Sequence, residues 1–269
     1  MLKLSRNLKK IFFICAVLLL SIFSVYVYLQ FDTDTNPKST NPSPLSEKQQ
    51  VLGFGSQIKT VELQKEIVAS WYVVSQPVKL ILMSNLQHKQ TAQTIFDNQN
   101  CKFLVSSGFY DIDDTHIGLF QFKDEQTSPL QSNELLNGFL TVNSFGTPMV
   151  ADTLSDDDLY LALQSGPLIY QNGQKIKLNL SSDKHSRRII AVVTGKNELL
   201  FIALYSNKQI FDGPYLSEVP NLLDTFVNKT GISIADAVNL DGGKASAFLS
   251  DDFSLTELSI IGGYFCYPR

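Results

Sequence analysis

Asp241 stands between a strand-like run and two glycines, at a place where a carboxylate could do chemistry. Residues 234–240 form a short apolar run, and Gly242 and Gly243 follow the aspartate. Because glycine lets the backbone turn sharply, the segment would leave the Asp241 side chain at the mouth of the strand. A carboxylate there could act as an acid, a base, a nucleophile or a ligand partner, and the two glycine amides could approach an anion. The same three residues also suit a simple turn.

The elements just before Asp241 would position it. Apolar residues in 216–227 recur at i, i+3, i+4 and i+7, and Gly231 stands where a left-handed C-cap belongs, which predicts a helix. Residues 234–240 then predict a buried strand. A helix followed by a strand would therefore deliver Asp241 to an edge of a sheet.

The remaining pattern predicts short strands separated by turns. Thr91 is a plausible N-cap for a short helix over 91–99. Residues 67–74 and 78–83 read as two strands joined by a tight connection. The other predicted strands are 103–105, 117–122, 138–143, 167–171, 188–194 and 199–205. This order predicts an α+β fold, a mixed β-sheet with helices packed on it.

Composition excludes several classes of protein. The chain has 269 residues, 44% of them hydrophobic and 18% charged, which excludes a disordered chain. Four basic residues lie in 1–10, and the rest of the chain holds 18 basic and 26 acidic side chains. Such an acidic body predicts no nucleic-acid partner.

Residues 11–29 predict a membrane-spanning segment. These nineteen residues carry no charge and would span roughly 28 Å as a helix, enough to cross the lipid bilayer. The basic residues precede them, so 1–10 are expected in the cytoplasm and the rest outside, as a single-pass protein of the cell membrane. The alternative is a cleaved signal peptide, although no small-residue cleavage site follows the run.

A polar stretch separates this anchor from the folded body. Residues 30–50 are rich in Asn, Pro, Ser and Thr and predict a flexible linker, which leaves 51–269 as one extracytoplasmic domain. Cys15, Cys101 and Cys266 have no metal-ligand spacing. Outside the cytoplasm Cys101 and Cys266 could pair, but their spacing alone does not decide it.

Several motifs together resemble the phosphodiester glycosidase family. The segment from Asn239 to Gly243, with Ser246 nearby, resembles the family's N-L-D-G-G-G-S element. Gln164-Ser165-Gly166-Pro167 resembles its Q-S-G-P element. Arg187-Arg188 resembles the basic residues that precede a hydrophobic strand in the family. Ser106-Ser107-Gly108-Phe109-Tyr110 resembles its N-G-G-F-F element, and Gly118-Leu119 its following G-L. The resemblance covers about residues 60–267.

The resemblance implies hydrolysis of a glycosyl phosphodiester. Such a reaction needs a carboxylate at the sugar or water and donors for the leaving phosphate. Asp241 is the predicted catalytic carboxylate, and Arg187 or Arg188 the predicted phosphate clamp. The predicted substrate-binding residues are Ser106, Ser107, Gly108, Gln164, Ser165, Gly166, Asn239, Gly242, Gly243, Lys244 and Ser246.

Two departures from the family pattern leave an alternative open. Ser106 stands where the family usually has Asn, and Lys244-Ala245 where a third glycine and a serine are usual. A glycan-binding or polysaccharide-assembly protein without catalysis is therefore a second hypothesis, and an ectodomain with a purely structural motif is a third. No cofactor and no metal site are predicted, and the sequence leaves open whether a divalent cation assists and whether the chain self-associates.

Overall fold

The computed structural model describes residues 57–154 and 158–269, which form three β-sheets. The described chain is mostly β, with 43% strand and 13% helix. Every strand pair in this part of the chain is antiparallel, so the predicted mixed sheet is wrong. The sequence pattern of a single strand does not show which strand it pairs with or in which direction.

The three sheets differ in size. The seven-stranded sheet has the order β1 (Lys59–Gln64), β2 (Ile67–Val74), β13 (Leu199–Ser206), β12 (Arg188–Thr194), β14 (Ile234–Leu240), β10 (Leu168–Gln171), β11 (Gln174–Lys175). The second has the order β16 (Phe253–Leu255), β15 (Phe248–Ser250), β4 (Cys101–Ser106), β17 (Gly263–Pro268), β3 (Ile81–Ser84). The third has the order β6 (Glu125–Ser128), β5 (Phe120–Phe122), β9 (Leu159–Ser165), β7 (Gly138–Asn143), β8 (Pro148–Ala151).

The main core lies where the three sheets face one another. Phe201 from the seven-stranded sheet, Phe103 from the second and Leu163 from the third belong to one buried cluster. Tyr72 stacks on Phe103 with ring centroids 4.1 Å apart. Because β12 and β13 are covered on both faces, they read as continuous apolar runs rather than as alternating strands.

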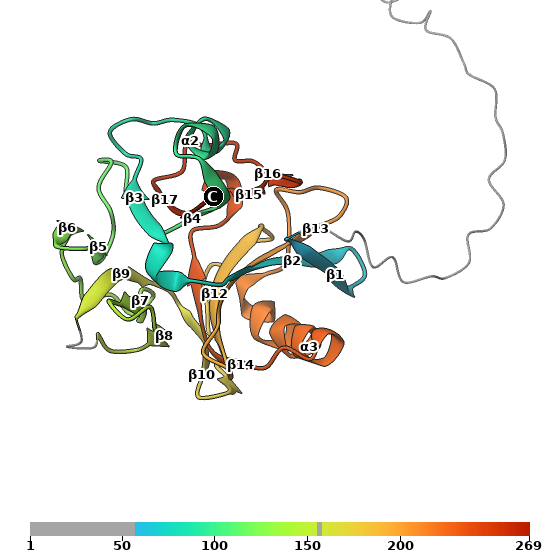
Figure 1. Cartoon of the computed structure of the whole chain (residues 1–269). Coiled ribbons are helices and arrows are strands. Elements are labelled where there is room, and N and C mark those ends of the chain that lie inside the picture. The colour runs from blue at the N-terminus through green and yellow to red at the C-terminus, as the bar shows by residue number, and fades with distance from the viewer. Residues whose placement is uncertain (1–56, 155–157) are drawn as a thin grey trace, which may run out of the picture. The chain divides into compact units, whose positions relative to one another are not determined.

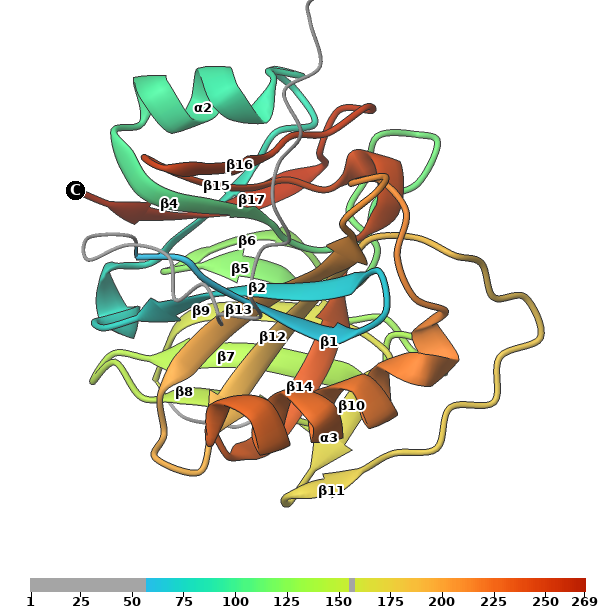
Figure 2. The ribbon, with the colours of Figure 1, turned by 90° about the vertical axis from the view of Figure 1, so that its right-hand side faces the viewer.

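The other face of the seven-stranded sheet is covered by α3 (Val219–Thr230), as Figures 1 and 2 show. Phe226 packs edge-on against Trp71, with centroids 5.1 Å apart. Gly231 ends the helix at a φ of 74°, as predicted. The first predicted turn is instead a separate 3₁₀ turn, η2 (Leu216–Glu218), because Pro220 has no N–H to continue an α-helical ladder from Leu216.

The second sheet is covered on its outer face by α2 (Ala92–Asn98). The Thr91 side chain accepts a hydrogen bond from the Thr94 N–H, which confirms the predicted N-cap. A disulfide joins Cys101 of β4 to Cys266 of β17, which is the pairing that the sequence left open.

We expect loss of this disulfide to lower the free energy of unfolding by about 2–4 kcal/mol, because the bond closes a long loop of the unfolded chain. Its two cysteines lie 165 residues apart in sequence. Urea unfolding of a double variant, Cys101→Ala with Cys266→Ala, measures the change. A reducing agent should destabilise the wild type and leave that variant unaffected; equal stability of the oxidised wild type and the variant would contradict the prediction.

Two strand predictions are wrong in detail. Residues 78–83 do not continue as a hairpin from β2, because Pro77 starts a 3₁₀ turn, η1 (Pro77–Lys79), and β3 then joins a different sheet. The strand predicted over 117–122 is shortened to β5, because Gly118 adopts a φ of 88° that breaks an extended strand.

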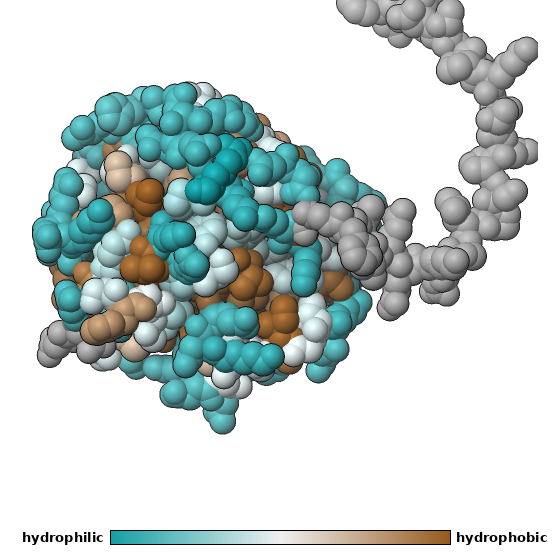
Figure 3. Space-filling model, in the orientation of Figure 1, coloured by the Kyte–Doolittle hydropathy of each residue, from teal (hydrophilic) through white to brown (hydrophobic). Residues whose placement is uncertain are grey.

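The visible face in Figure 3 is mostly hydrophilic, with separate hydrophobic patches between the polar side chains, which is ordinary for a folded domain. None of the described helices has the length and hydrophobicity needed to span a bilayer. The predicted anchor at 11–29, the basic tail at 1–10 and the linker at 30–50 lie outside the described residues.

Candidate active site

Strand pairing brings the motifs of the seven-stranded sheet to one edge. Ile189 of β12 lies opposite Leu240 of β14, so Arg188 and Asp241 are at the same end of neighbouring strands. Leu168 of β10 lies opposite Val238, which places Gly166 close to that end as well. Segments far apart in sequence therefore converge beside Asp241.

The second sheet supplies the Ser106–Gly108 segment to the same place. The Ser106 hydroxyl donates a hydrogen bond to the Asp241 carbonyl at 3.1 Å, and the Asp241 N–H donates to the Ser107 carbonyl at 2.9 Å. Asp241 thus sits at the junction of two sheets, fixed through its backbone on one side by β4.

The environment of Asp241 favours the protonated carboxyl group. Burial raises the pKa of Asp241 to about 8, and the Gly242 N–H, which bonds to the carboxylate, lowers it only in part. The residue as a whole is half-buried. Burial also raises the pKa of Tyr110, and the charge of Asp241 adds to that shift, so the two groups lie close enough to interact. The surroundings of Asp241 thus favour its protonated form at neutral pH.

Gly242 and Gly243 are needed where they stand because the chain turns against β12. A Cβ on Gly242 would lie 2.6 Å from the Arg187 carbonyl oxygen. Gly243 has a φ of 65°, and its N–H donates to the same carbonyl at 2.8 Å. Both glycines therefore serve the tight turn that follows Asp241.

We expect Gly242→Ala to cost about 1–3 kcal/mol of stability and to lower any activity of the site, because the added methyl group must push β12 away from the Asp241 turn. Thermal unfolding and the activity assay described below measure the two effects. Gly173→Asn is the matched control: no atom lies within 4 Å of a Cβ there, and asparagine tolerates the φ of 75°. Equal behaviour of the two variants would contradict this account.

Arg187 is a buried support of the Asp241 loop, with its guanidinium directed into the protein. Its Nε donates to the Ser246 hydroxyl at 2.8 Å, and its Nη2 donates to the Thr256 carbonyl at 2.8 Å and to the Ser246 carbonyl. The side chain is fully buried, and burial lowers its pKa to about 10, so it remains charged at neutral pH. These bonds tie η3 (Gly243–Ala245) and the segment near Thr256 to β12.

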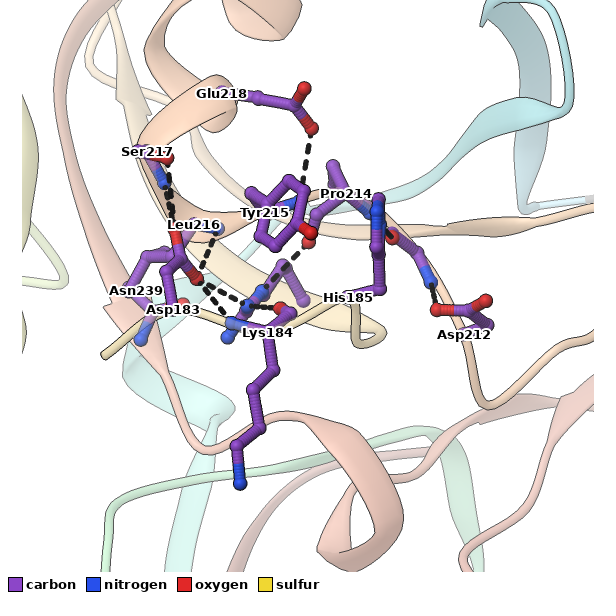
Figure 4. Close-up of polar contacts among 12 residues, drawn as sticks. Asp183, Lys184, His185, Asp212, Pro214, Tyr215, Leu216, Ser217, Glu218 and Asn239 are labelled. Atoms are coloured by element: carbon purple, nitrogen blue, oxygen red, sulfur yellow. Dashed lines mark hydrogen bonds and ion pairs between the residues drawn. The ribbon is translucent and has the colours of Figure 1, made fainter. Parts of the chain in front are cut away.

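Arg188 points to the opposite face of β12 and supports another loop. It forms an ion pair with Asp183 at 3.1 Å and donates to the Pro214 carbonyl at 3.2 Å. Figure 4 shows Asp183 beside Ser217 and Leu216, whose N–H groups donate hydrogen bonds to its carboxylate. Lys184 extends away from this cluster. Burial opposes ionisation of Asp183, but these hydrogen bonds and Arg188 hold its pKa below the usual range.

The two predicted phosphate-clamp arginines therefore have partners within the protein. In the described residues, neither guanidinium bonds to Asp241. The cation at the turn is Lys244, which is exposed and makes no ion pair within 57–154 and 158–269.

The Gln164–Gly166 segment forms buried hydrogen bonds that connect the strands beside Asp241. Gln164 is buried, and its amide bonds to backbone groups of Leu119, Gln131 and Leu136. The Ser165 hydroxyl donates to the Asn239 carbonyl at 2.7 Å, and the Asn239 amide donates to the Gly166 carbonyl at 2.9 Å. Asn239 Oδ1 is buried without a hydrogen-bond partner in the described part.

The predicted serines differ in what they offer a ligand. The Ser246 hydroxyl accepts from Arg187 and donates to the Gly243 carbonyl at 2.8 Å, so it is committed to the loop. The Ser107 hydroxyl is buried and has no hydrogen-bond partner among the described residues. Ser107 is the serine with bonding capacity left beside Asp241.

His116 lies next to this edge and is not among the residues predicted for the site. Its spacing to His88 and His185 in the sequence does not suggest a metal site. Its position two residues before Gly118, inside the family-like stretch, was the available signal. Within the described residues, no group of three or more His, Cys, Asp or Glu side chains could hold a metal ion.

Comparisons with known proteins agree with the motifs. A family model described as phosphodiester glycosidase matches residues 99–259. The fold is similar to the catalytic domain of zebrafish N-acetylglucosamine-1-phosphodiester alpha-N-acetylglucosaminidase, at 12% identity and a TM-score of 0.59 over 81% of this chain and 85% of that one. A hypothetical protein from Synechocystis is similar at 13% identity and a TM-score of 0.52, over 79% and 64% of the chains. No curated protein sequence matches significantly.

Proposed function

Since the chain belongs to the phosphodiester glycosidase family, whose model matches more than half of its residues, we propose that it hydrolyses a glycosyl phosphodiester with Asp241 as the general acid. The observation that carries the proposal is the position of Asp241. It directly follows the central strand β14, its backbone bonds to Ser106 and Ser107 beside the second sheet, and burial raises its pKa to about 8.

A neutral carboxyl group suits an anionic substrate. An ionised carboxylate would repel the phosphodiester, whereas the protonated group can hydrogen-bond to it and then donate its proton to the leaving phosphate oxygen. A carboxyl pKa near the working pH is what an efficient general acid needs.

We assign the other contacts from what the side chains have left to offer. Lys244 is the exposed cation beside Asp241 and would attract the phosphate. The unpartnered hydroxyl of Ser107 would bond to a sugar hydroxyl or a phosphate oxygen. Arg187 and Arg188 would hold the loops that carry these groups, because their own donors already bond to the protein.

We place the reaction outside the cytoplasm, at the cell membrane, on surface polysaccharide or glycolipid. Residues 11–29 carry no charge and follow a basic segment, which is the pattern of a membrane anchor with its body outside. The Cys101–Cys266 disulfide supports an oxidising compartment.

The second candidate is a protein that binds glycan without cleaving it. The observation in its favour is Ser106, which stands where the family usually has Asn. Its hydroxyl donates to the Asp241 carbonyl and so is not available as a donor to a ligand. Lys244-Ala245 also replaces the usual glycine and serine.

One assay separates the two candidates. The full chain, purified in detergent, is incubated with methyl phosphodiesters of α-N-acetylglucosamine, α-glucose and α-mannose 1-phosphate, and released sugar and bound ligand are both measured. We expect sugar release from at least one of them. Retention of ligand with no release would establish the binding protein, and neither retention nor release would contradict both candidates.

A further inference from the structure

His116 is a buried histidine that packs beside the Asp241 edge and contacts a half-buried serine. Its exposed fraction is 4%, and its ring stacks on Phe120 with centroids 3.9 Å apart. The ring Nε2 lies 2.9 Å from the Ser84 hydroxyl at the end of β3. This is the geometry of a serine whose proton a histidine can take.

The second sheet connects this pair to Asp241. Ser84 lies opposite Gly263 in the β3–β17 pairing, and the Ser107 N–H donates to the Gly263 carbonyl at 3.0 Å. A Cβ on Gly263 would lie 2.6 Å from the Ser107 hydroxyl and 3.1 Å from His116 Cε1. Glycine at 263 therefore lets His116 approach Ser107, whose carbonyl in turn holds the Asp241 N–H.

Tyr110 provides a second connection between the two groups. It forms an isolated bridge with His116, and it interacts electrostatically with Asp241. Lys89 and Asp114, from the surrounding segments, pair with each other at the surface. His116, Tyr110 and Asp241 thus lie in one continuous region of the molecule.

At neutral pH the carboxyl group of Asp241, the imidazole of His116 and the phenol of Tyr110 are all in their uncharged forms. Burial lowers the pKa of His116 to about 4, although the Phe109 carbonyl acts in the opposite direction, so the imidazole is neutral and able to accept a proton. Burial and the neighbouring carboxylates raise the pKa of Tyr110 further above its ordinary value, so the phenol keeps its proton. A neutral carboxyl group and a neutral imidazole with separated pKa values are the arrangement expected of an acid and base pair.

We propose that Ser84 is a second catalytic residue of this site, which contacts the attacking water, and that His116 acts through it as a positioning residue and proton acceptor. The inference rests on the proposed glycosidase function. The water oxygen bonds to the anomeric carbon as the bond from that carbon to the phosphate oxygen breaks. The water proton passes to Ser84 Oγ, the Ser84 proton passes to His116 Nε2, and the Asp241 proton passes to the departing phosphate.

The step leaves the net charge of the site residues unchanged, because Asp241 becomes a carboxylate as His116 becomes an imidazolium. Burial disfavours both charged forms, so neither persists after turnover. The reverse transfer through solvent restores both groups before the next turnover.

Five variants test the proposal on any phosphodiester that the wild type hydrolyses. We expect Ser84→Ala and His116→Gln each to lower kcat by about 10²-fold or more with KM within a few-fold, and the double variant to be no worse than the poorer single one. Ser84→Thr keeps the hydroxyl and should recover most of the rate. His88→Gln, an exposed histidine, is the matched control and should behave as wild type. The fall in kcat below about pH 4 should disappear in His116→Gln.

Ser84 is half-buried, so Ser84→Ala should fold, and thermal unfolding checks every variant. If folded Ser84→Ala and His116→Gln both keep the wild-type kcat while Asp241→Asn loses activity, the inference is overturned and the proposed function stands. If the wild type releases no sugar from any phosphodiester, the proposed function fails and the inference fails with it.

Discussion

Replacing Asp241 with Asn is expected to lower kcat/KM for a glycosyl phosphodiester by about 10²–10⁴-fold at pH 7, the usual contribution of a general acid. Asparagine keeps the size of the side chain but cannot release a proton to the leaving phosphate. Because burial raises the pKa of Asp241 to about 8, wild-type activity should also fall as the pH rises through 8. Released sugar, measured from pH 5 to pH 10, tests both expectations.

The same substitution should stabilise the fold at neutral pH. Between pH 3.8 and about 8 the unfolded state loses this proton while the folded state keeps it, so the stability of the wild type declines as the pH rises through that window. Asparagine removes this penalty, which we expect to be at least about 1 kcal/mol at pH 7. Thermal unfolding at pH 4 and pH 7 should show the difference between the proteins growing with pH.

Asp236→Asn is the matched control, because Asp236 lies on the same strand, near its other end. It should keep the wild-type activity. An Asp241→Asn variant that is active and less stable than the wild type would show that Asp241 is only a turn residue held in its ionised form.

Arg187→Ala is expected to lower the free energy of unfolding by about 3–5 kcal/mol, because it leaves several buried acceptors without a donor and opens a cavity. The substitution leaves the carbonyls of Ser246 and Thr256 and the Ser246 hydroxyl without their donor. Since those groups hold the turn after Asp241, activity should fall with stability. Arg187→Lys should recover little, because an ammonium cannot reproduce the planar fork of donors.

Arg269→Ala provides the comparison for that measurement. Arg269 is partly exposed and pairs with Asp251, so its loss should cost no more than about 1 kcal/mol. Urea unfolding of both variants gives the two values. If Arg187→Ala unfolds like Arg269→Ala but no longer binds the phosphodiester, the guanidinium contacts substrate and the supporting role is wrong.

Local sequence patterns predicted the elements that deliver Asp241. The helical repeat in 216–227, the cap at Gly231 and the apolar run at 234–240 each depend on near neighbours. β14 lies where it was expected, and α3 ends at the predicted cap but begins at Val219 and not at Leu216. Continuous apolar runs likewise identified β12 and β13, which are buried on both faces.

Contacts between distant segments could not be predicted in this way. The division of strands among three sheets puts β2 and β3 apart although few residues separate them. β9 and β17 have no clear strand boundaries in sequence, yet each lies inside a sheet. Local sequence patterns also could not show that Ser246 and Thr256 accept hydrogen bonds from Arg187. These bonds give Arg187 a structural role in place of the predicted contact with phosphate.

The proton on Asp241 is the central claim, and its pKa can be measured directly. In protein labelled with ¹³C at the aspartate carboxyl carbon, the resonance that Asp241→Asn removes should titrate near pH 8. A midpoint at or below the ordinary aspartate value of about 3.8 would mean that the group is ionised at neutral pH, and the general-acid account would be wrong.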